Sequence, residues 1–218
     1  MRVQKNSQSK LCLAILWIFT FSTISECVAF PSGSNSELSG LISKAESGDA
    51  KAQANLAWIY WYGIGIDENP FQAYKWAKKS ASGSIISKYI LAVSVGEWGA
   101  TDKSVSREKI FNEISSEIQK IDIEKDSRLK LIKGVLVKFG YIKDAKRSDG
   151  LSLIMKASDA GDPAAQVVLS IIFYSGDGVL KNEELARDYA LKSSKNNCTR
   201  ALKMLSRFLS LTAEESKS

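Results

Sequence analysis

The chain has 218 residues, of which 44% are hydrophobic, and it carries a formal net charge of +6 with no histidine. This length and hydrophobic share are sufficient for one domain with a buried core. The lack of histidine excludes Ser-His and Cys-His nucleophile pairs and most zinc sites. Acidic and basic residues are interspersed, whereas a nucleic-acid-binding protein would concentrate its basic residues in one stripe, so we expect no nucleic-acid partner.

Residues 1–29 have the pattern of a secretory signal peptide. Three basic residues precede an uncharged apolar run at 11–24, and Ala29 stands before a cleavage point at Phe30. The run is shorter than the ~20 apolar residues of a membrane-spanning helix, so we expect cleavage at 29/30 rather than an uncleaved membrane anchor. Lipidation of Cys27 is the alternative. The mature protein would then be periplasmic or secreted, with no membrane span.

Cleavage of this signal would leave Cys198 as the one cysteine of the mature chain, which therefore has no internal disulfide. We expect Cys198 to be a small buried residue at the start of a helix. Residues 30–35 form a Pro/Gly/Ser linker, and a short helix is expected from about Ser36 to Ser47, before the first repeated unit.

Residues 45–83 predict one antiparallel helical hairpin. Asp49 precedes a run of apolar residues spaced three and four apart, where its carboxylate can cap the first helix. Gly63 and Gly65 stop that helix, because glycine adopts the left-handed conformation that a tight reversal needs. Asn69, followed by a proline, starts the second helix as its cap.

The hairpin recurs near the end of the chain. A shift of 113 positions without a gap places residues 48–83 on 161–196, and the caps, the helix stops and the apolar positions coincide. The matched pairs include Gly48 and Gly161, Asp49 and Asp162, Leu56 and Leu169, Gly63 and Gly176, and Asn69 and Asn182. An internal repeat of this length indicates a solenoid of stacked helical hairpins.

The spacing also predicts the number of units. The 78 positions between Gly83 and Gly161 leave room for two units of 39, so we expect four hairpins from Gly48 to Asn196, with degenerate units at 84–157. After the first hairpin, helices are expected at 84–95, 104–121, 125–139, 146–160, 163–174, 182–194 and 198–211. The last of these has a polar back, as the cap of a solenoid requires, and residues 212–218 form a tail.

The motif A-Q-x-x-L-x-x-I-Y-x-x-G-x-G-I, followed by N-x-x-x-A-x-x-W-x-x-K-S-A-x-G, resembles the Sel-one-like repeat family, short relatives of tetratricopeptide repeats. The resemblance covers the two clear repeats at 45–83 and 158–196. It implies an all-α, right-handed superhelix of αα-hairpins in a single solenoid domain over 36–211, with about four hairpins plus terminal helices. It also implies protein binding. The sequence contains no cofactor-binding motif, so we expect no cofactor.

A separate face of the first helices carries apolar side chains in three hairpins. These residues are Trp58 and Tyr62 in the first hairpin, Ile90 and Val93 one unit later, and Val168 and Ile171 in the last unit. In tetratricopeptide-like solenoids the first helix of each pair lines the concave surface, so the resemblance implies a groove that binds a partner segment. The alternative is that a tight superhelix buries these side chains against its own neighbours.

We expect an exported, non-catalytic adaptor of the bacterial cell envelope that binds another protein in this groove. We predict no catalytic, metal-binding or cofactor-binding residue. One alternative is a periplasmic immunity or inhibitor protein that neutralises a toxin or effector. Another is a cell-wall or β-lactam hydrolase, although both hairpins lack the cysteine pair of the relatives that act on β-lactams. The divergent segment 100–149 is where we expect specificity, because the repeat does not constrain it.

Overall fold

The computed structural model describes residues 35–95 and 104–215, so the predicted signal peptide (1–29) and most of the linker (30–35) lie outside the described residues. Within these ranges the chain forms ten α-helices, one 3-10 turn and one isolated β-bridge. The helices are α1 (Asn35–Glu46), α2 (Ala50–Tyr62), α3 (Pro70–Ser80), α4 (Ile85–Ser94), α5 (Arg107–Ile118), α6 (Ser127–Lys138), α7 (Arg147–Asp159), α8 (Pro163–Ser175), α9 (Glu183–Ser194) and α10 (Thr199–Glu215), with the 3-10 turn η1 at Ala81–Gly83. The predicted all-α helical-repeat solenoid is confirmed.

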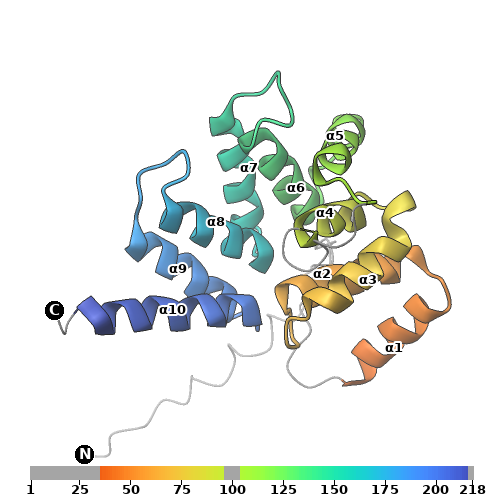
Figure 1. Ribbon diagram of the computed structural model, residues 1–218, viewed down its shortest axis with the longest axis horizontal. Coiled ribbons are helices and arrows are strands. Elements are labelled where there is room, and N and C mark those ends of the chain that lie inside the picture. Colours follow the sequence, from red (N-terminus) through yellow and green to blue (C-terminus); the bar gives the residue numbers. More distant parts are fainter. Residues whose placement is uncertain (1–34, 96–103, 216–218) are drawn as a thin grey trace, which may run out of the picture.

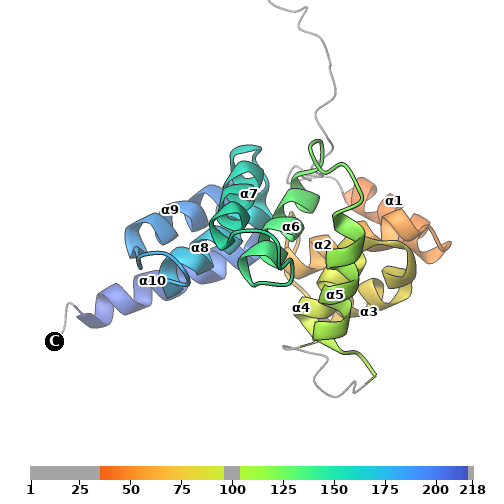
Figure 2. The same ribbon diagram turned by 90° about the horizontal axis from the view of Figure 1, so that it is seen from above.

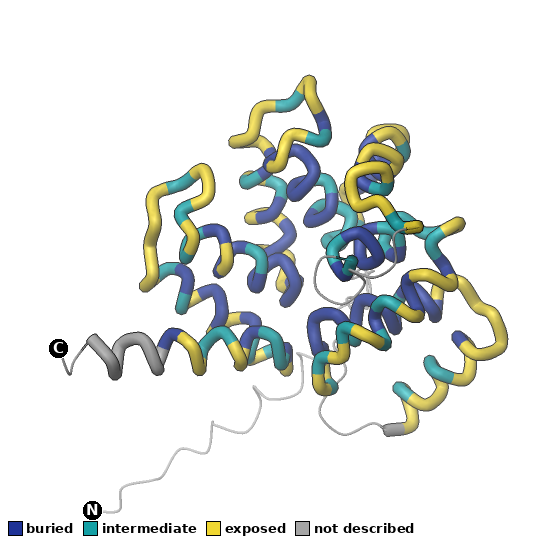
Figure 3. Tube along the Cα trace, viewed as in Figure 1, coloured by how far each residue is buried: buried dark blue, intermediate teal, exposed yellow. Residues whose placement is uncertain are grey.

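Four successive hairpins follow one another around an arc (Figure 1). They are α2–α3, α4–α5, α6–α7 and α8–α9, with α1 before them and α10 after them. The first helices of the hairpins, α2, α4, α6 and α8, each contact the next first helix and are called the inner helices below. Seen from above, α6 lies between the half of the arc that holds α1–α5 and the half that holds α7–α10 (Figure 2). Buried residues gather toward the inside of this arc (Figure 3).

The two clear repeats have the same local structure. Asp49 accepts a hydrogen bond from the Ala52 amide at 2.8 Å, and Gly63 ends α2 with a left-handed φ of 66°. In the last hairpin Asp162 caps α8, and Gly176 ends it with φ 70°. The second helices begin in the same way, because the side chains of Asn69 and Asn182 each accept from a backbone amide three residues on.

The equivalent interior positions also have equivalent contacts. Leu56 and Leu169 are both fully buried. The amide nitrogen Nε2 of Gln53 donates to the Ala45 carbonyl at 2.9 Å, and Nε2 of Gln166 donates to the matching Ser158 carbonyl at 3.4 Å. Each glutamine thus ties its hairpin to the helix before it, and a buried amide without that acceptor would be costly.

The degenerate units use different packing. Helices α6 and α7 cross closely at Gly134 and Gly150, where a Cβ on Gly150 would lie 2.6 Å from the Gly134 carbonyl oxygen. In the clear repeats the second helix instead buries an alanine and an aromatic residue, Ala73 and Trp76 in α3 and Ala186 and Tyr189 in α9. In the α6–α7 hairpin, Gly134 and Gly150 allow the two helices to approach closely. This hairpin therefore forms although the sequence motif of the repeat is absent from it.

Polar contacts hold the N-terminal part of α6 to its neighbours. The hydroxyl of Ser127 donates to the Asp162 carboxylate at 2.9 Å, and Nη1 of Arg128 donates to Oδ1 of Asn55 at 2.8 Å. Burial raises the pKa of Asp162 above its ordinary value, and the hydrogen bonds from Ser127 and from the backbone of α8 oppose that rise. The inner helices therefore approach one another closely enough to exclude water.

The start of α10 closes the arc onto the first hairpin. The Gly65 amide donates to the Asn197 carbonyl and the Thr199 amide donates to the Gly63 carbonyl, both at 2.9 Å. Cys198 between them is fully buried, as predicted, and its thiol contacts the Tyr62 carbonyl oxygen at 3.0 Å. We call this contact between residues 63–68 and 197–203 the closure contact. In Figure 1 the N-terminal end of α10 points toward α2 and α3.

The core positions shared by the repeats predict a loss of stability on truncation. Leu56→Ala and Leu169→Ala should each lower the free energy of unfolding by about 2–5 kcal/mol, because each leaves a cavity among fully buried neighbours. Leu180→Ala is the control, since that side chain is 91% exposed, and should change stability by less than about 0.5 kcal/mol. Chemical denaturation of the three variants measures this. Equal effects at Leu56 and Leu180 would contradict the packing.

The closure contact predicts different costs for two equivalent glycines. Each glycine has a left-handed backbone, and this conformation alone should lower the free energy of unfolding of Gly63→Ala and of Gly176→Ala by about 1–2 kcal/mol. A Cβ on Gly63 would also lie 1.8 Å from the Thr199 hydroxyl, whereas on Gly176 its nearest neighbour is at 3.2 Å. We therefore expect Gly63→Ala to be the more destabilising in thermal unfolding. Equal costs would show that the closure contact does not restrain the turn.

Candidate functional site

The C-terminal parts of the four inner helices surround an open pocket of about 470 Å³. Side chains of α5, α10 and the segment after α6 complete its wall. Ten of the twelve described residues that line it are apolar or aromatic, and the other two are Arg107 and Arg200. The pocket therefore presents an apolar surface with a basic rim, which suits an apolar ligand that is extended by a polar group.

Four of the six residues predicted to line a groove do line this pocket. They are Tyr62, Val93, Val168 and Ile171, of which Ile171 is 48% exposed. Trp58 and Ile90 lie earlier in the same helices and are buried, with 4% and 0% of their surface exposed. Tyr62 is itself only 2% exposed, so the tight packing weighed as the alternative describes Trp58, Tyr62 and Ile90. Whether any of the six binds a partner protein stays a prediction.

A series of aromatic rings supports the pocket from inside. The ring of Tyr62 lies 4.9 Å from that of Trp58, Trp58 lies 6.1 Å from Tyr89, Tyr89 lies 6.4 Å from Phe111, and Phe111 lies 4.7 Å from Tyr141. Such tilted pairs each add about 0.5–1.5 kcal/mol beyond the area that they bury. Burial raises the pKa of both Tyr62 and Tyr89, so their hydroxyl groups stay protonated at neutral pH. These buried rings are therefore uncharged and packed against one another.

The two arginines are held by helix ends. Nε of Arg107 donates to the Ala92 carbonyl at 3.0 Å, near the end of α4. Nε of Arg200 donates to the Trp61 carbonyl at 3.1 Å near the end of α2, and its guanidinium lies 4.3 Å from the centre of the Trp61 ring. Basic groups are favourable at these ends, because the last carbonyls of a helix carry partial negative charge.

Sequence reasoning missed several residues of the pocket. Phe139 is the largest omission, since it is 51% exposed and lies at the end of α6, within the degenerate units. Arg107 and Arg200 were missed as well, because they belong to α5 and α10 rather than to an inner helix. The periodicity of the repeat points only to first helices of regular units, so it contains no signal for these three.

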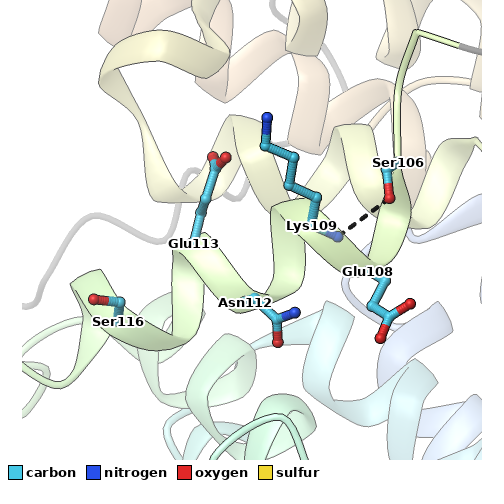
Figure 4. A pocket seen from close by; sticks show the side chains of 6 residues that line it. All are labelled: Ser106, Glu108, Lys109, Asn112, Glu113 and Ser116. Carbon is cyan, nitrogen blue, oxygen red and sulfur yellow. Dashed lines mark hydrogen bonds between the residues drawn. The ribbon is translucent and has the colours of Figure 1, made fainter.

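A second hollow, of about 570 Å³, lies along the outer face of α5 (Figure 4). Its six lining residues are all polar, all exposed, and all come from α5 and its cap, Ser106. Lys109 and Glu113 are one helical turn apart there and both extend into solvent. This arrangement is a solvated helix face, with no second wall to hold a ligand.

Over residues 35–95 and 104–215 no three of the His, Cys, Asp and Glu side chains are placed to hold a metal ion. None of the helices described there is both long and apolar enough to cross a membrane. The pocket has the features of a binding surface, namely exposed apolar side chains on a closely packed support.

Known proteins share the repeat. The model of the Sel1 repeat matches residues 50–84 and 163–198, whereas no curated protein shows significant similarity to the chain. A Sel1 repeat protein from Oxalobacter formigenes is 19% identical, with 78% of this chain and 73% of that one covered and a TM-score of 0.35. The protective antigen c5321 of uropathogenic Escherichia coli, which displays an SLR fold, is 22% identical over 77% of this chain and 35% of that one, with a TM-score of 0.39.

Sel1 repeat proteins are generally protein–protein interaction modules and typically non-catalytic scaffolds. The two matched segments coincide with the hairpins α2–α3 and α8–α9, which share their caps, their left-handed glycines and their buried leucines. Two segments of the chain are therefore Sel1 repeats, and the chain is similar to proteins of the Sel1-like repeat family.

Proposed function

We propose that this protein is a non-catalytic adaptor that binds an apolar segment of a partner protein in the pocket at the C-terminal parts of the inner helices. The observation that carries the proposal is the pair Phe139 and Ile171, which are 51% and 48% exposed and line the same pocket. Large apolar side chains that stay half-exposed around a concave surface are typical of binding sites, because covering them with a partner releases water.

The export of the protein to the bacterial cell envelope is part of the same proposal. It is supported by the sequence pattern of residues 1–29, with its basic start, apolar run and small residue before the cleavage point. An immunity or inhibitor protein would be a narrower form of the same function, in which the partner is a toxin or effector. The identity of the bound partner distinguishes the two. The hydrolase alternative stays a hypothesis from the sequence, with no structural observation that favours it.

The sharpest test truncates exposed residues only. Trp58 and Tyr62 are unsuitable, because removing a buried aromatic side chain costs about 3–5 kcal/mol and would confuse loss of binding with loss of folding. The double variant Phe139→Ala/Ile171→Ala removes the two exposed anchors instead. Its matched control is Phe71→Ala/Leu191→Ala, since these side chains are 59% and 46% exposed and lie on the outer helices α3 and α9.

Residues 30–218 of the wild type and of both double variants are used to capture proteins from envelope and secreted fractions, and bound proteins are quantified by mass spectrometry. We expect a partner that the wild type and the control retain equally. The pocket variant should retain at least about tenfold less, because central apolar anchors contribute 1 kcal/mol or more each, roughly. Equal capture by both double variants would place binding elsewhere on the surface and contradict the proposal.

A further inference from the structure

We infer that the partner segment carries an acidic side chain beside its apolar anchor, and that Arg107 and Arg200 recognise this carboxylate. The inference rests on the proposed function and specifies the chemistry of the partner. The charges at the pocket support it. Arg107 and Arg200 are the only charged side chains among its described lining residues, and no carboxylate is among them. An acidic segment therefore meets favourable charge at the rim, and a basic segment is repelled.

The case for binding a partner carboxylate is stronger for Arg107 than for Arg200. The side chain of Arg107 is exposed, and it donates to the Ala92 carbonyl at 3.0 Å and to the Val93 carbonyl at 3.5 Å. Over 35–95 and 104–215 it forms no ion pair. A guanidinium group has five N–H donors in a plane, so these two bonds leave donors that can bind a carboxylate. Because the carbonyls fix the side chain, little conformational entropy remains to be lost on binding.

Arg200 belongs to a cluster of two basic side chains and one carboxylate. Its Nε lies 3.1 Å from the Glu68 carboxylate, and Nζ of Lys203 lies 2.6 Å from the other oxygen of the same carboxylate. One carboxylate thus serves two cations in this cluster. The Trp61 ring beneath the guanidinium holds it at the edge of the pocket. The closure contact brings this cluster to the pocket, since Glu68 follows α2 and both cations belong to α10.

The acidic groups nearest in sequence do not neutralise the rim. Glu108, next to Arg107, belongs to the outer hollow of α5 rather than to the pocket (Figure 4). Asp177 pairs with Lys138 at 3.5 Å beside Phe139, so that pair is neutral. The ends of α2 and α4 would by themselves disfavour an anion, because helix C-termini are partly negative. The two arginines bind those carbonyls and reverse the sign of the charge at the rim.

The test uses random 12-residue peptides displayed on phage and fused at their C-termini, so that their own carboxylates are Asp and Glu side chains. The library is selected on residues 30–218 of the wild type. The best clone is then made as a blocked synthetic peptide together with its Asn/Gln isostere. Both are measured by fluorescence anisotropy against the wild type, Arg107→Gln, Arg107→Lys, and the control Lys75→Gln, which removes an exposed charge from the outer helix α3.

We expect the selected peptides to combine an aromatic or large aliphatic residue with a neighbouring Asp or Glu. The acidic peptide should bind the wild type about tenfold more tightly than its isostere, and this advantage should shrink as salt concentration rises. Arg107→Gln should remove most of the advantage without weakening the isostere. Arg107→Lys should keep part of it because the charge remains, and Lys75→Gln should leave it unchanged.

Two results would overturn the inference, and they are distinguishable. Apolar peptides without carboxylates, or equal binding of the acidic peptide and its isostere, would refute the recognition of an acid while the proposed function stands. Selected peptides that bind Phe139→Ala/Ile171→Ala as well as the wild type, or no selected peptides at all, would refute the apolar pocket as a binding site and with it the proposed function.

Discussion

The closure contact is the constraint on which the rest of the structure depends. Thr199 hydrogen-bonds both to the backbone of Gly63 and, through its hydroxyl, to the Glu68 amide, across 131 or more positions of sequence. In an open solenoid each hairpin contacts only its neighbours, so the ends are free to fray. Here the last helix is bonded to the first hairpin. Opening of either end therefore breaks contacts that also involve the other end.

The pocket is a consequence of that closure. Tyr62 lies directly before the bonded turn, and Arg200 follows Thr199 at the start of α10, so the wall formed by α2 and α10 exists only when the two meet. The aromatic rings from Tyr62 to Tyr141 pack behind this wall and across three of the hairpins. A pocket built on such packed elements changes little when a ligand enters, and this limits the entropic cost of binding.

The same geometry explains why apolar and basic groups occur together at this site. Phe139 and Ile171 stay about half-exposed at the pocket, beside buried apolar residues of the inner helices. The carbonyl groups at the C-terminal ends of these helices need donors, and Arg107 and Arg200 supply them. The proposed binding surface thus consists of apolar side chains that the repeats do not cover, together with the two arginines that donate to the carbonyl groups at the helix ends.

The sequence by itself determined the helices, their order and the repeated interior. Caps such as Asp49 and Asn69, the left-handed Gly63 and the spacing of Leu56 are local requirements of a helical hairpin, so their physical reason lies within about 35 residues and repeats in the second copy. The regular face of the first helices also predicted four of the pocket residues. These features depend on neighbours in sequence, which a pattern can record.

Only the tertiary structure decided the curvature of the arc, and with it which of those side chains stay accessible. Trp58 and Ile171 occupy the same kind of face, yet one is 4% exposed and the other 48%, because the first is covered by neighbouring hairpins. Phe139, Arg107 and Arg200 entered the pocket through the degenerate units and through the closure contact. Both depend on contacts between residues far apart in the sequence, and no local pattern specifies how far a superhelix bends before its ends meet.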